Sequence, residues 1–375
     1  MKNFTKPVAL LITIAFAHLV NDWYSLIIVP AIPILKQVYK IDYFQSGMLL
    51  SIPYIVSAIL QSPIAHFSEY RAKRKFSLIA GFLILSLSYL MFYFSTSYYF
   101  TLFTTVFIGI GLGTYHPQGM GILSTVFKEK KGLAIGLNGT GGALGYFLAP
   151  ITMGYLLSKF GTDAFVFVAI PGIIMALTIL FIVKIEEKPI KSKMRSTITK
   201  DLIILSFVAI VIPFFSRGIM SFLPSYFYEK GYNIFDANLK ASIMLFAGIV
   251  AQPLGGFVSD KMGRRKTISF SYFLLGVFLL LFIHYTSLIF LFFMGFFMSL
   301  SIPVRHAFAA EVGGKNVNTN IAVVFSMVMI FSSIAPSLVG ALVDHFGFSL
   351  AFSLNALIAF AGSILVMFIK QDRKA

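Results

Sequence analysis

The segments AHFSEYRAKRK (residues 65–75) and GFVSDKMGRRK (residues 256–266) are two copies of one pattern. In each copy a small residue, a serine and an acid are followed by a cluster of basic residues, and the copies begin 191 residues apart. The same offset aligns Gln61 with Gln252. Because self-similarity at a fixed offset indicates a duplicated architecture, the sequence predicts two homologous halves.

The composition is that of a protein whose solvent is lipid. Of the 375 residues, 58% are hydrophobic and 12% are charged, and the mean hydropathy is +0.88. Too few polar residues remain to cover a water-soluble surface. The absence of cysteine excludes disulfides, thiolate metal sites and cysteine nucleophiles. The first apolar run continues past Trp23 without a small-residue cleavage site, and we interpret it as a retained helix rather than a signal peptide.

Twelve apolar runs are long enough to span a bilayer, which requires about 20 residues. Charged or turn-forming clusters bound each run. The sequence therefore predicts an all-α integral membrane protein of twelve transmembrane helices. The predicted spans are 8–34, 44–66, 76–95, 99–126, 132–158, 164–184, 202–228, 239–259, 267–285, 288–309, 318–344 and 348–369.

The thirty lysines and arginines predict the orientation of these spans. With the N-terminus inside, 23 of them lie on the same side of the membrane as the two termini, and five lie in the opposite loops. Because basic loops are retained on the cytoplasmic side, we expect both termini in the cytoplasm and the protein in the plasma membrane. The net charge of +16 is then mainly a topology signal with anionic lipid headgroups as neighbours, and nucleic acid is not an expected partner.

One long polar connection, KIEEKPIKSKMRSTITKD (184–201), lies at the middle of the chain. Its charge density and its lack of apolar periodicity favour a linker, and a short amphipathic helix on the membrane is the other interpretation. Two bundles with substrate bound between them are typical of secondary transporters. We predict an N-terminal six-helix bundle at 1–185, a cytoplasmic linker at 186–201 and a C-terminal six-helix bundle at 202–375.

Ionisable residues inside predicted spans are functional candidates, because charge is costly in a bilayer. Asp22 lies deep in the first span, and His18 lies one helical turn earlier on the same face. An imidazole beside a carboxylate can share or relay a proton near neutral pH. We interpret the two as a proton-coupling pair, and a structural hydrogen bond is the alternative. A metal site is disfavoured, because only two ligands are visible.

Further candidates lie in the fourth, seventh and tenth spans. Pro117 is expected to interrupt the fourth span directly after His116, and broken helices belong where they line cavities. Arg217 requires an anion, a carboxylate partner such as Asp22, or water. Arg305 could bind substrate or extend to the headgroups. The expected proton-coupling residues are Asp22, His18 and His116, and the expected substrate contacts are Arg217, Tyr115, Gln118, Asn21 and Arg305.

The second loop copy also carries a family resemblance. GFVSDKMGRRK closely resembles the signature loop of the major facilitator superfamily, whose members use such loops as a gate latch. The resemblance implies gating roles for both copies, and simple topology anchoring is the alternative. In the first copy, Ala65 and Ala72 stand in place of glycines. The implied gating residues are Glu69, Arg71, Gly256, Asp260, Gly263, Arg264 and Arg265.

The fifth predicted span resembles the antiporter motif of drug exporters in that superfamily. Small residues let helix backbones approach closely, and a proline bends the helix. Ordinary glycine-rich packing is the alternative, so export is implied by the resemblance alone. The motif residues are Gly136, Gly145, Pro150 and Gly154, and Ala149 and Met153 replace two family glycines.

Several segments together resemble the fosmidomycin-resistance-protein group of the superfamily. Gln118 replaces the glutamate that this group leads us to expect after His-Pro, which shifts proton coupling toward Asp22 and His116. The segments are His18 to Asp22 with Pro30 and Pro33, Gln61 with Pro63, YHPQG at 115–119, GLAIGL at 132–137 followed by Gly141 and Gly142, and Arg217 with Phe222, Leu223 and Pro224.

We therefore predict a proton-coupled exporter of small organic molecules or drugs that works by alternating access, without a cofactor or covalent chemistry. The alternative is a proton-coupled symporter for an anionic metabolite, with Arg217 or Arg305 on its carboxylate. An intramembrane enzyme using His18 and Asp22 is a remote alternative, because the sequence has no metal-binding set, nucleophile elbow or phosphate loop. The expected partners are substrate, protons and the bilayer, and the resemblance implies a monomer.

Overall fold

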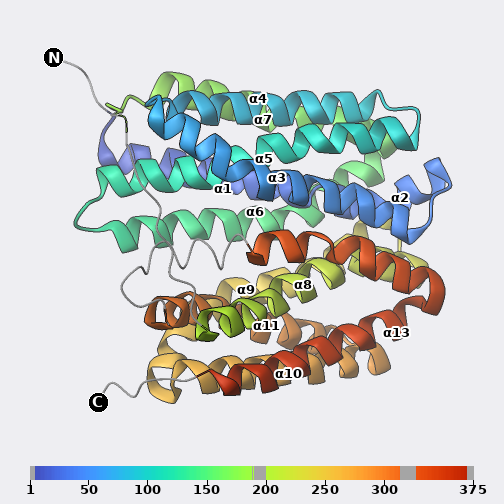
Figure 1. Ribbon diagram of the computed structural model, residues 1–375. Helices are drawn as coiled ribbons and strands as arrows, with labels where there is room; N and C mark the ends of the chain where they lie inside the picture. The colour runs from blue at the N-terminus through green and yellow to red at the C-terminus, as the bar shows by residue number, and fades with distance from the viewer. Residues whose placement is uncertain (1–4, 188, 190–199, 313–326, 370–375) are drawn as a thin grey trace. The chain divides into compact units, whose positions relative to one another are not determined.

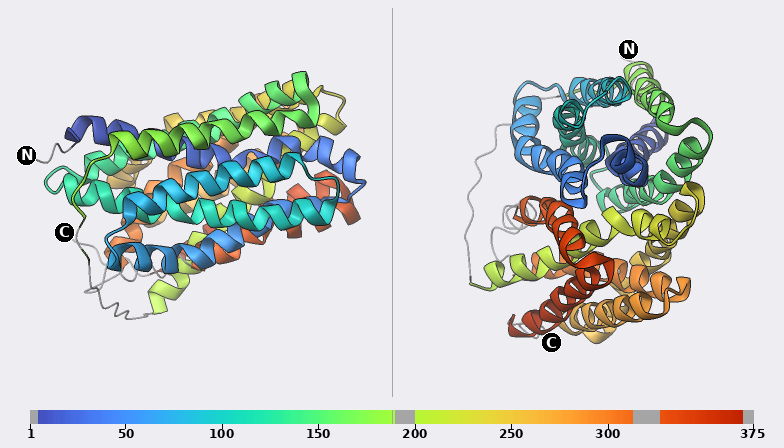
Figure 2. Two further views of the ribbon diagram at one scale, coloured as in Figure 1. Left: turned by 90° about the horizontal axis from the view of Figure 1, so that it is seen from above. Right: turned by 90° about the vertical axis from the view of Figure 1, so that its right-hand side faces the viewer.

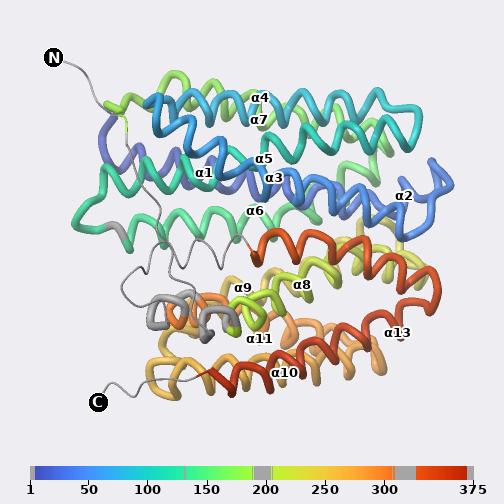
Figure 3. Tube along the Cα trace, viewed as in Figure 1, coloured from blue at the N-terminus to red at the C-terminus, as the bar shows by residue number. Residues whose placement is uncertain are grey.

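The computed structural model describes residues 5–187, 189, 200–312 and 327–369 (Figures 1 and 3). These residues contain helices and no β-strand, which confirms the predicted all-α class. The helices are α1 (Pro7–Leu26), α2 (Ile28–Tyr39), α3 (Tyr43–Tyr70), α4 (Arg74–Tyr93), α5 (Tyr98–Val126), α6 (Lys131–Phe160), α7 (Ala164–Ile182), α8 (Lys200–Glu229), α9 (Ile234–Met262), α10 (Arg264–Tyr285), α11 (Leu288–Val312) and α13 (Ala335–Leu365), with short 3₁₀ turns η1 (Gly161–Asp163) and η3 (Val366–Phe368).

Nine stretches of the described residues are long and apolar enough to cross a membrane. Two of these stretches, Gly132–Ile182 and Met327–Phe368, each cover two predicted spans, because Gly161 ends α6 and Gly347 divides α13 at φ 74°. Together with α5, the described helices occupy the positions of the twelve predicted spans. Residues 318–326 of the eleventh predicted span lie outside the described residues.

The first predicted span is broken into α1 and α2 shortly before Pro30. Proline has no N–H to donate to the preceding turn, so a break here leaves carbonyl groups without helical donors. The Tyr89 hydroxyl donates to the Tyr24 carbonyl at 2.7 Å, and the Tyr54 hydroxyl donates to the Ser25 carbonyl at 2.9 Å. Side chains of α4 and α3 therefore stabilise the break, one turn beyond Asp22.

The predicted interruption of the fourth span at Pro117 is wrong, because α5 continues through this proline to Val126. A single proline in a transmembrane helix is tolerated where neighbouring groups satisfy the freed carbonyl. His116 therefore projects from regular helix rather than from an unwound backbone.

The described residues cluster into two compact units, whose helices run along one another within each unit (Figure 2). In unit 1, α1 packs on α6, and α4 packs on α5 and α7. In unit 2, α10 packs on α11 and α13, and α13 packs on α8. Unit 1 comprises Met1–Ile41, Met48–Ser192 and Gly231–Leu239, and unit 2 comprises Asp42–Gly47, Lys193–Lys230 and Lys240–Ala375.

Candidate functional site

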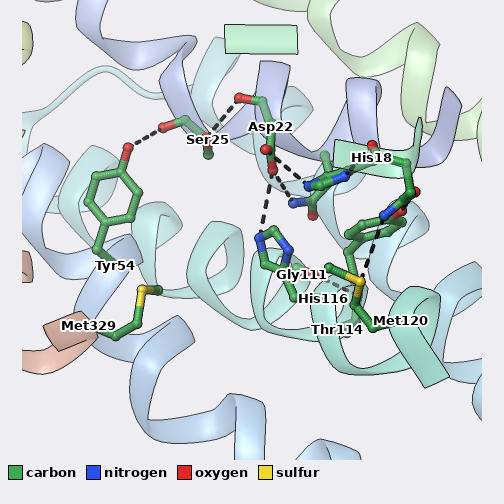
Figure 4. A network of polar contacts seen from close by, with 12 residues as sticks. His18, Asp22, Ser25, Tyr54, Gly111, Thr114, His116, Met120 and Met329 are labelled. Carbon is green, nitrogen blue, oxygen red and sulfur yellow. Dashed lines mark hydrogen bonds and ion pairs between the residues drawn. The ribbon is translucent and has the colours of Figure 1, made fainter. Parts of the chain in front are cut away.

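His18 and Asp22 meet inside unit 1 (Figure 4). They lie one turn apart on α1, and the two residues are only 6% and 4% exposed. The helical period places them on one face, and Nε2 of His18 lies 3.2 Å from Oδ2 of Asp22. The geometry expected of a proton-sharing pair is therefore present in a buried site.

The hydrogen bonds of His18 determine how many protons the pair carries. Nδ1 lies 2.8 Å from the carbonyl oxygen of Asn138, and because a carbonyl only accepts, Nδ1 carries a proton and donates it. Nε2 then faces the Asp22 carboxylate, and that contact is attractive only when one proton lies between the two atoms. The contact therefore requires one proton, on either Nε2 or the carboxyl group.

Asp22 has two further neighbours. Nδ2 of Asn21 donates to Oδ1 of Asp22 at 3.0 Å, and Nε2 of His116 lies 3.7 Å from the same oxygen. The side chain of His116 is 37% exposed, whereas that of Asp22 is 6% exposed. His116, from α5, is therefore the member of the cluster that a solute reaches first.

Tyr115 and Gln118, two of the predicted substrate contacts, are fully buried and bind other groups of unit 1. The Tyr115 ring stacks on His18 with centroids 4.9 Å apart, and its hydroxyl lies 2.8 Å from both the Ile14 carbonyl and Oδ1 of Asn138. Gln118 accepts a hydrogen bond from Ser68 at 2.8 Å. Tyr115 thus holds the imidazole that binds Asp22, and Gln118 ties α5 to the end of α3.

Glycines of α6 form the wall that covers the pair. A Cβ atom on Gly142 would lie 2.5 Å from Oδ2 of Asp22 and 2.7 Å from Nε2 of His18. A Cβ on Gly145 would lie 2.2 Å from the Leu19 carbonyl oxygen. These distances are too short for any side chain, so α6 can approach α1 here only because both positions are glycine.

The remaining residues of the predicted helix motif differ in their surroundings. A Cβ on Gly136 would have no other atom within 4 Å, whereas a Cβ on Gly154 would lie 2.8 Å from Cβ of Asn238. Pro150 lies inside α6, which continues to Phe160. Close packing therefore explains Gly145 and Gly154, and it leaves Gly136 unexplained.

The cluster of His18, Asp22 and His116 also has the residue types that bind a metal ion. One ligand atom each of His18, Asp22 and His116 lies within 4.8 Å of the others, and they are the group among the described residues that could hold a metal ion. The sequence revealed two of these ligands, and the third comes from α5. Coordination by His18 would require Nε2 to lose the proton that now joins it to Asp22.

Arg217 lies in α8 of unit 2, in a half-buried polar pocket. Its Nη1 atom donates to Ser332 Oγ at 2.8 Å, to Ser333 Oγ at 3.1 Å and to the Met329 carbonyl at 3.3 Å. These three acceptors belong to the helical residues 327–333. The pocket holds the guanidinium in a fixed direction, as a site for an acidic group requires.

Arg305 lies elsewhere in unit 2 and is only 7% exposed. Its Nη1 atom donates to the Ala209 carbonyl at 2.7 Å. Contact with substrate and extension to the headgroups, the two roles expected from the sequence, stay predictions. The partner of Arg305 is the backbone of α8.

The two loop copies share a backbone turn but differ in their ion pairs. Ala72 has a φ of 53° and Gly263, at the equivalent position, has a φ of 85°, so the turn persists where alanine replaces glycine. Asp260 pairs with Arg264 at 2.6 Å, whereas Glu69 pairs with Arg74 at 3.0 Å. The remaining predicted gating residues are Arg71 beside the Phe67 ring, Arg265 bound to the carbonyls of Met367 and Ile369, and Gly256 with nothing near its Cβ position.

A carboxylate from the predicted linker caps the N-terminus of α4, directly after the first loop copy. Glu187 accepts hydrogen bonds from the backbone N–H groups of Arg74 at 2.5 Å and Lys75 at 2.9 Å. The first N–H groups of a helix have no intrahelical acceptor, and the helix dipole favours an anion there. Glu187, and not Glu69 of the first loop copy, is thus the acid at the N-terminus of α4.

Substituting Glu187→Gln is expected to lower the apparent unfolding temperature of the purified protein by about 2 °C, because the N-terminus of α4 loses an anionic cap worth about 1 kcal/mol. The measurement is intrinsic fluorescence during heating in detergent. Glu186→Gln is the matched control, since Glu186 is the exposed neighbour and should leave the temperature unchanged. Equal shifts in both variants would contradict the capping role.

Several residues of the site gave no signal in the sequence. Asn138 acts through its carbonyl oxygen, which every residue has, and Glu187 lies in a linker rich in charge. Gly142 is one of eight glycines between residues 132 and 161. Only the glycine pair at 141 and 142 offered a signal, as a marker of close helix approach.

Comparison with known proteins agrees with this architecture. Residues 14–236 and 205–375 match the Major Facilitator Superfamily. The chain is 22% identical to the fosmidomycin resistance protein of Escherichia coli (strain K12) over 96% of this chain and 92% of that protein. It is 27% identical to the protein named "Probable nitrate transporter NarT" of Staphylococcus carnosus (strain TM300) over 68% and 67% of the two chains.

A solved structure supports the same fold. It is described as a bacterial homologue of the human lysosomal transporter Spinster in an inward-facing and occupied conformation, and it superposes with a TM-score of 0.80. The match covers 97% of this chain and 96% of that chain at 16% identity, so it concerns the fold alone. Two homologous sets of membrane-spanning helices and a match over most of the sequence lead to one conclusion: the chain is a multi-pass membrane transporter, not an enzyme, and belongs to the Major Facilitator Superfamily.

Proposed function

We propose that the protein is a proton-coupled exporter, an antiporter of small organic molecules, that works by alternating access. The observation that carries the proposal is the buried pair of His18 and Asp22, which holds one exchangeable proton beside the more exposed His116. Ionisable groups inside a membrane mark proton or substrate paths. The name of the Escherichia coli relative, a resistance protein, supports export.

In the proposed cycle the proton and the substrate occupy the cluster in turn. When the proton leaves, the Asp22 carboxylate faces the lone pair of neutral His18, and the contact becomes repulsive. The opened cluster then accepts a polar group of the substrate, which meets His116 first. Return of the proton restores the contact of His18 with Asp22 and displaces the substrate. Such mutually exclusive occupancy is what an antiporter requires.

Within unit 2, Arg217 is a proposed substrate contact. Arg217 presents a guanidinium held by Ser332 and Ser333, and a guanidinium is suited to bidentate binding of a carboxylate or phosphate-like group. We propose a monomer in the plasma membrane with both termini in the cytoplasm, as the distribution of basic residues favours.

Fosmidomycin is the transport probe for the first test. Expression in a fosmidomycin-sensitive bacterium is expected to raise the inhibitory concentration several-fold, and the Asp22→Asn variant is expected to remove that gain. Inside-out vesicles then provide the direct measurement. With an acidic interior, an antiporter moves protons out and accumulates the probe inside. The absence of both resistance and proton-dependent accumulation would exclude export of this probe.

Proton-coupled uptake of an anion is the second candidate, and the name of the Staphylococcus carnosus relative favours it. The same vesicles separate the two directions. A symporter would carry a preloaded anion outward together with protons and would accumulate none. Outward movement of preloaded nitrate, driven by the acidic interior, would therefore replace the proposal of export.

A further inference from the structure

The second unit contains a carbonyl group that its own helix cannot bind. Pro213 lies inside α8, and a proline has no N–H for the carbonyl four residues earlier, which is that of Ala209. No water is available inside a bilayer to replace the missing donor. The Ala209 carbonyl must therefore find a donor on another helix.

Arg305 supplies this donor. Its Nη1 atom, on α11, lies 2.7 Å from the Ala209 carbonyl oxygen. The adjacent carbonyl of Val208 accepts a hydrogen bond from the Tyr272 hydroxyl of α10 at 3.0 Å. Side chains of two neighbouring helices thus bind consecutive carbonyls of α8 at its proline.

The surroundings of Arg305 point to this single role. The residue is 7% exposed, and it belongs to none of the four ion pairs among the described residues. Its Nε atom is buried without a hydrogen-bond partner. A cation that binds substrate or lipid needs an accessible face, and little of Arg305 is accessible.

The internal repeat aligns the α8 residues of this contact with the proton pair of α1 in the sequence. The offset of 191 residues that relates the two loop copies aligns Ala209 with His18 and Pro213 with Asp22. The first half has two titratable side chains at these positions of α1. The second half has Pro213 and the carbonyl of Ala209, which this proline leaves without a helical donor. Arg217 lies one turn beyond Pro213 in the same helix.

We propose that Arg305 is a positioning residue, which stabilises α8 at Pro213 by binding the carbonyl that this proline leaves unpaired, and which thereby sets the direction of Arg217. This role does not depend on the direction of transport or on the substrate. The first half thus carries the proposed proton site, and at the aligned positions the second half carries a fixed charge that stabilises a helix at its proline.

A double-mutant cycle on the full-length protein in detergent tests the proposal. Arg305→Met removes every donor and is expected to lower the apparent unfolding temperature by about 5 °C, because a buried carbonyl loses its partner. Pro213→Ala restores a backbone N–H to that carbonyl. In the Pro213→Ala background, Arg305→Met is therefore expected to cost less than half as much. Arg305→Lys, which keeps a donor, should recover part of the loss.

Amide hydrogen exchange gives a local readout. Arg305→Met is expected to speed exchange in the 205–217 segment of α8 more than in α9, and Pro213→Ala should reverse this difference. Pro171→Ala, in α7 of unit 1, is the matched control and should leave the effect of Arg305→Met unchanged. The same loss with and without Pro213, including failure to fold in both backgrounds, would overturn the proposal. Full stability of Arg305→Met would also overturn it.

Discussion

Asp22→Asn is expected to yield a folded protein that no longer exchanges a proton when the transport probe binds. Wild-type protein holds one proton between Nε2 of His18 and Oδ2 of Asp22, 3.2 Å apart. The substituted amide is nearly the same size, and its N–H group can donate to Nε2, so the contact survives. A carboxamide does not ionise, however, and proton-driven transport should fall to the level of vesicles without protein.

The measurement is the pH change of a weakly buffered solution of purified protein on addition of the probe, followed by transport in vesicles. Asp163→Asn is the matched control, because this residue is an exposed carboxylate in η1 and should retain the wild-type proton signal. A normal signal from Asp22→Asn would assign the exchanged proton to another group, with His116 the first candidate.

Gly142→Ala is expected to reduce transport at least about tenfold, as strain of about 1–3 kcal/mol at this contact would do. The added methyl group would lie 2.5 Å from Oδ2 of Asp22 and 2.7 Å from Nε2 of His18. Either α6 moves away from α1 or the pair separates, and both changes remove the shared proton. The defect should appear in the proton signal as well as in transport.

Gly136→Ala provides the comparison for this substitution. Gly136 lies in the same helix, and its Cβ position has no atom within 4 Å, so alanine should be tolerated or slightly stabilising through its higher helix propensity. Both variants add the same methyl group to α6, and they differ only in the atoms that surround it. Equal activity of Gly142→Ala and Gly136→Ala would show that α6 does not pack against the pair in the active protein.

The helices were predictable because each depends on a local property of the chain. A run of about 20 apolar residues is needed to cross a bilayer, and the runs ended close to where the helices end. The fourth span, for example, was predicted at 99–126, and α5 covers Tyr98–Val126. The predicted interruption at Pro117 was the exception, because it is the groups around a helix that decide whether a proline breaks it.

One half of the candidate site was predictable for the same reason. The contact of His18 with Asp22 follows from the period of a single helix, which places residues four apart on one face. The partners from other helices were not predictable in the same way. His116 was recognised as a candidate by its chemistry, but its position 3.7 Å from Asp22 depends on how α5 is rotated against α1.

The sequence by itself determined the all-α membrane architecture, the internal repeat and the pair on α1, because composition, apolar run length and helical period are properties of the chain alone. Only the tertiary structure decided that the Asn138 carbonyl orients His18, that Gly142 covers the pair and that Arg305 binds the Ala209 carbonyl. These contacts join residues 96 to 124 positions apart in the chain. They depend on the rotation and depth at which helices pack, which no local pattern specifies.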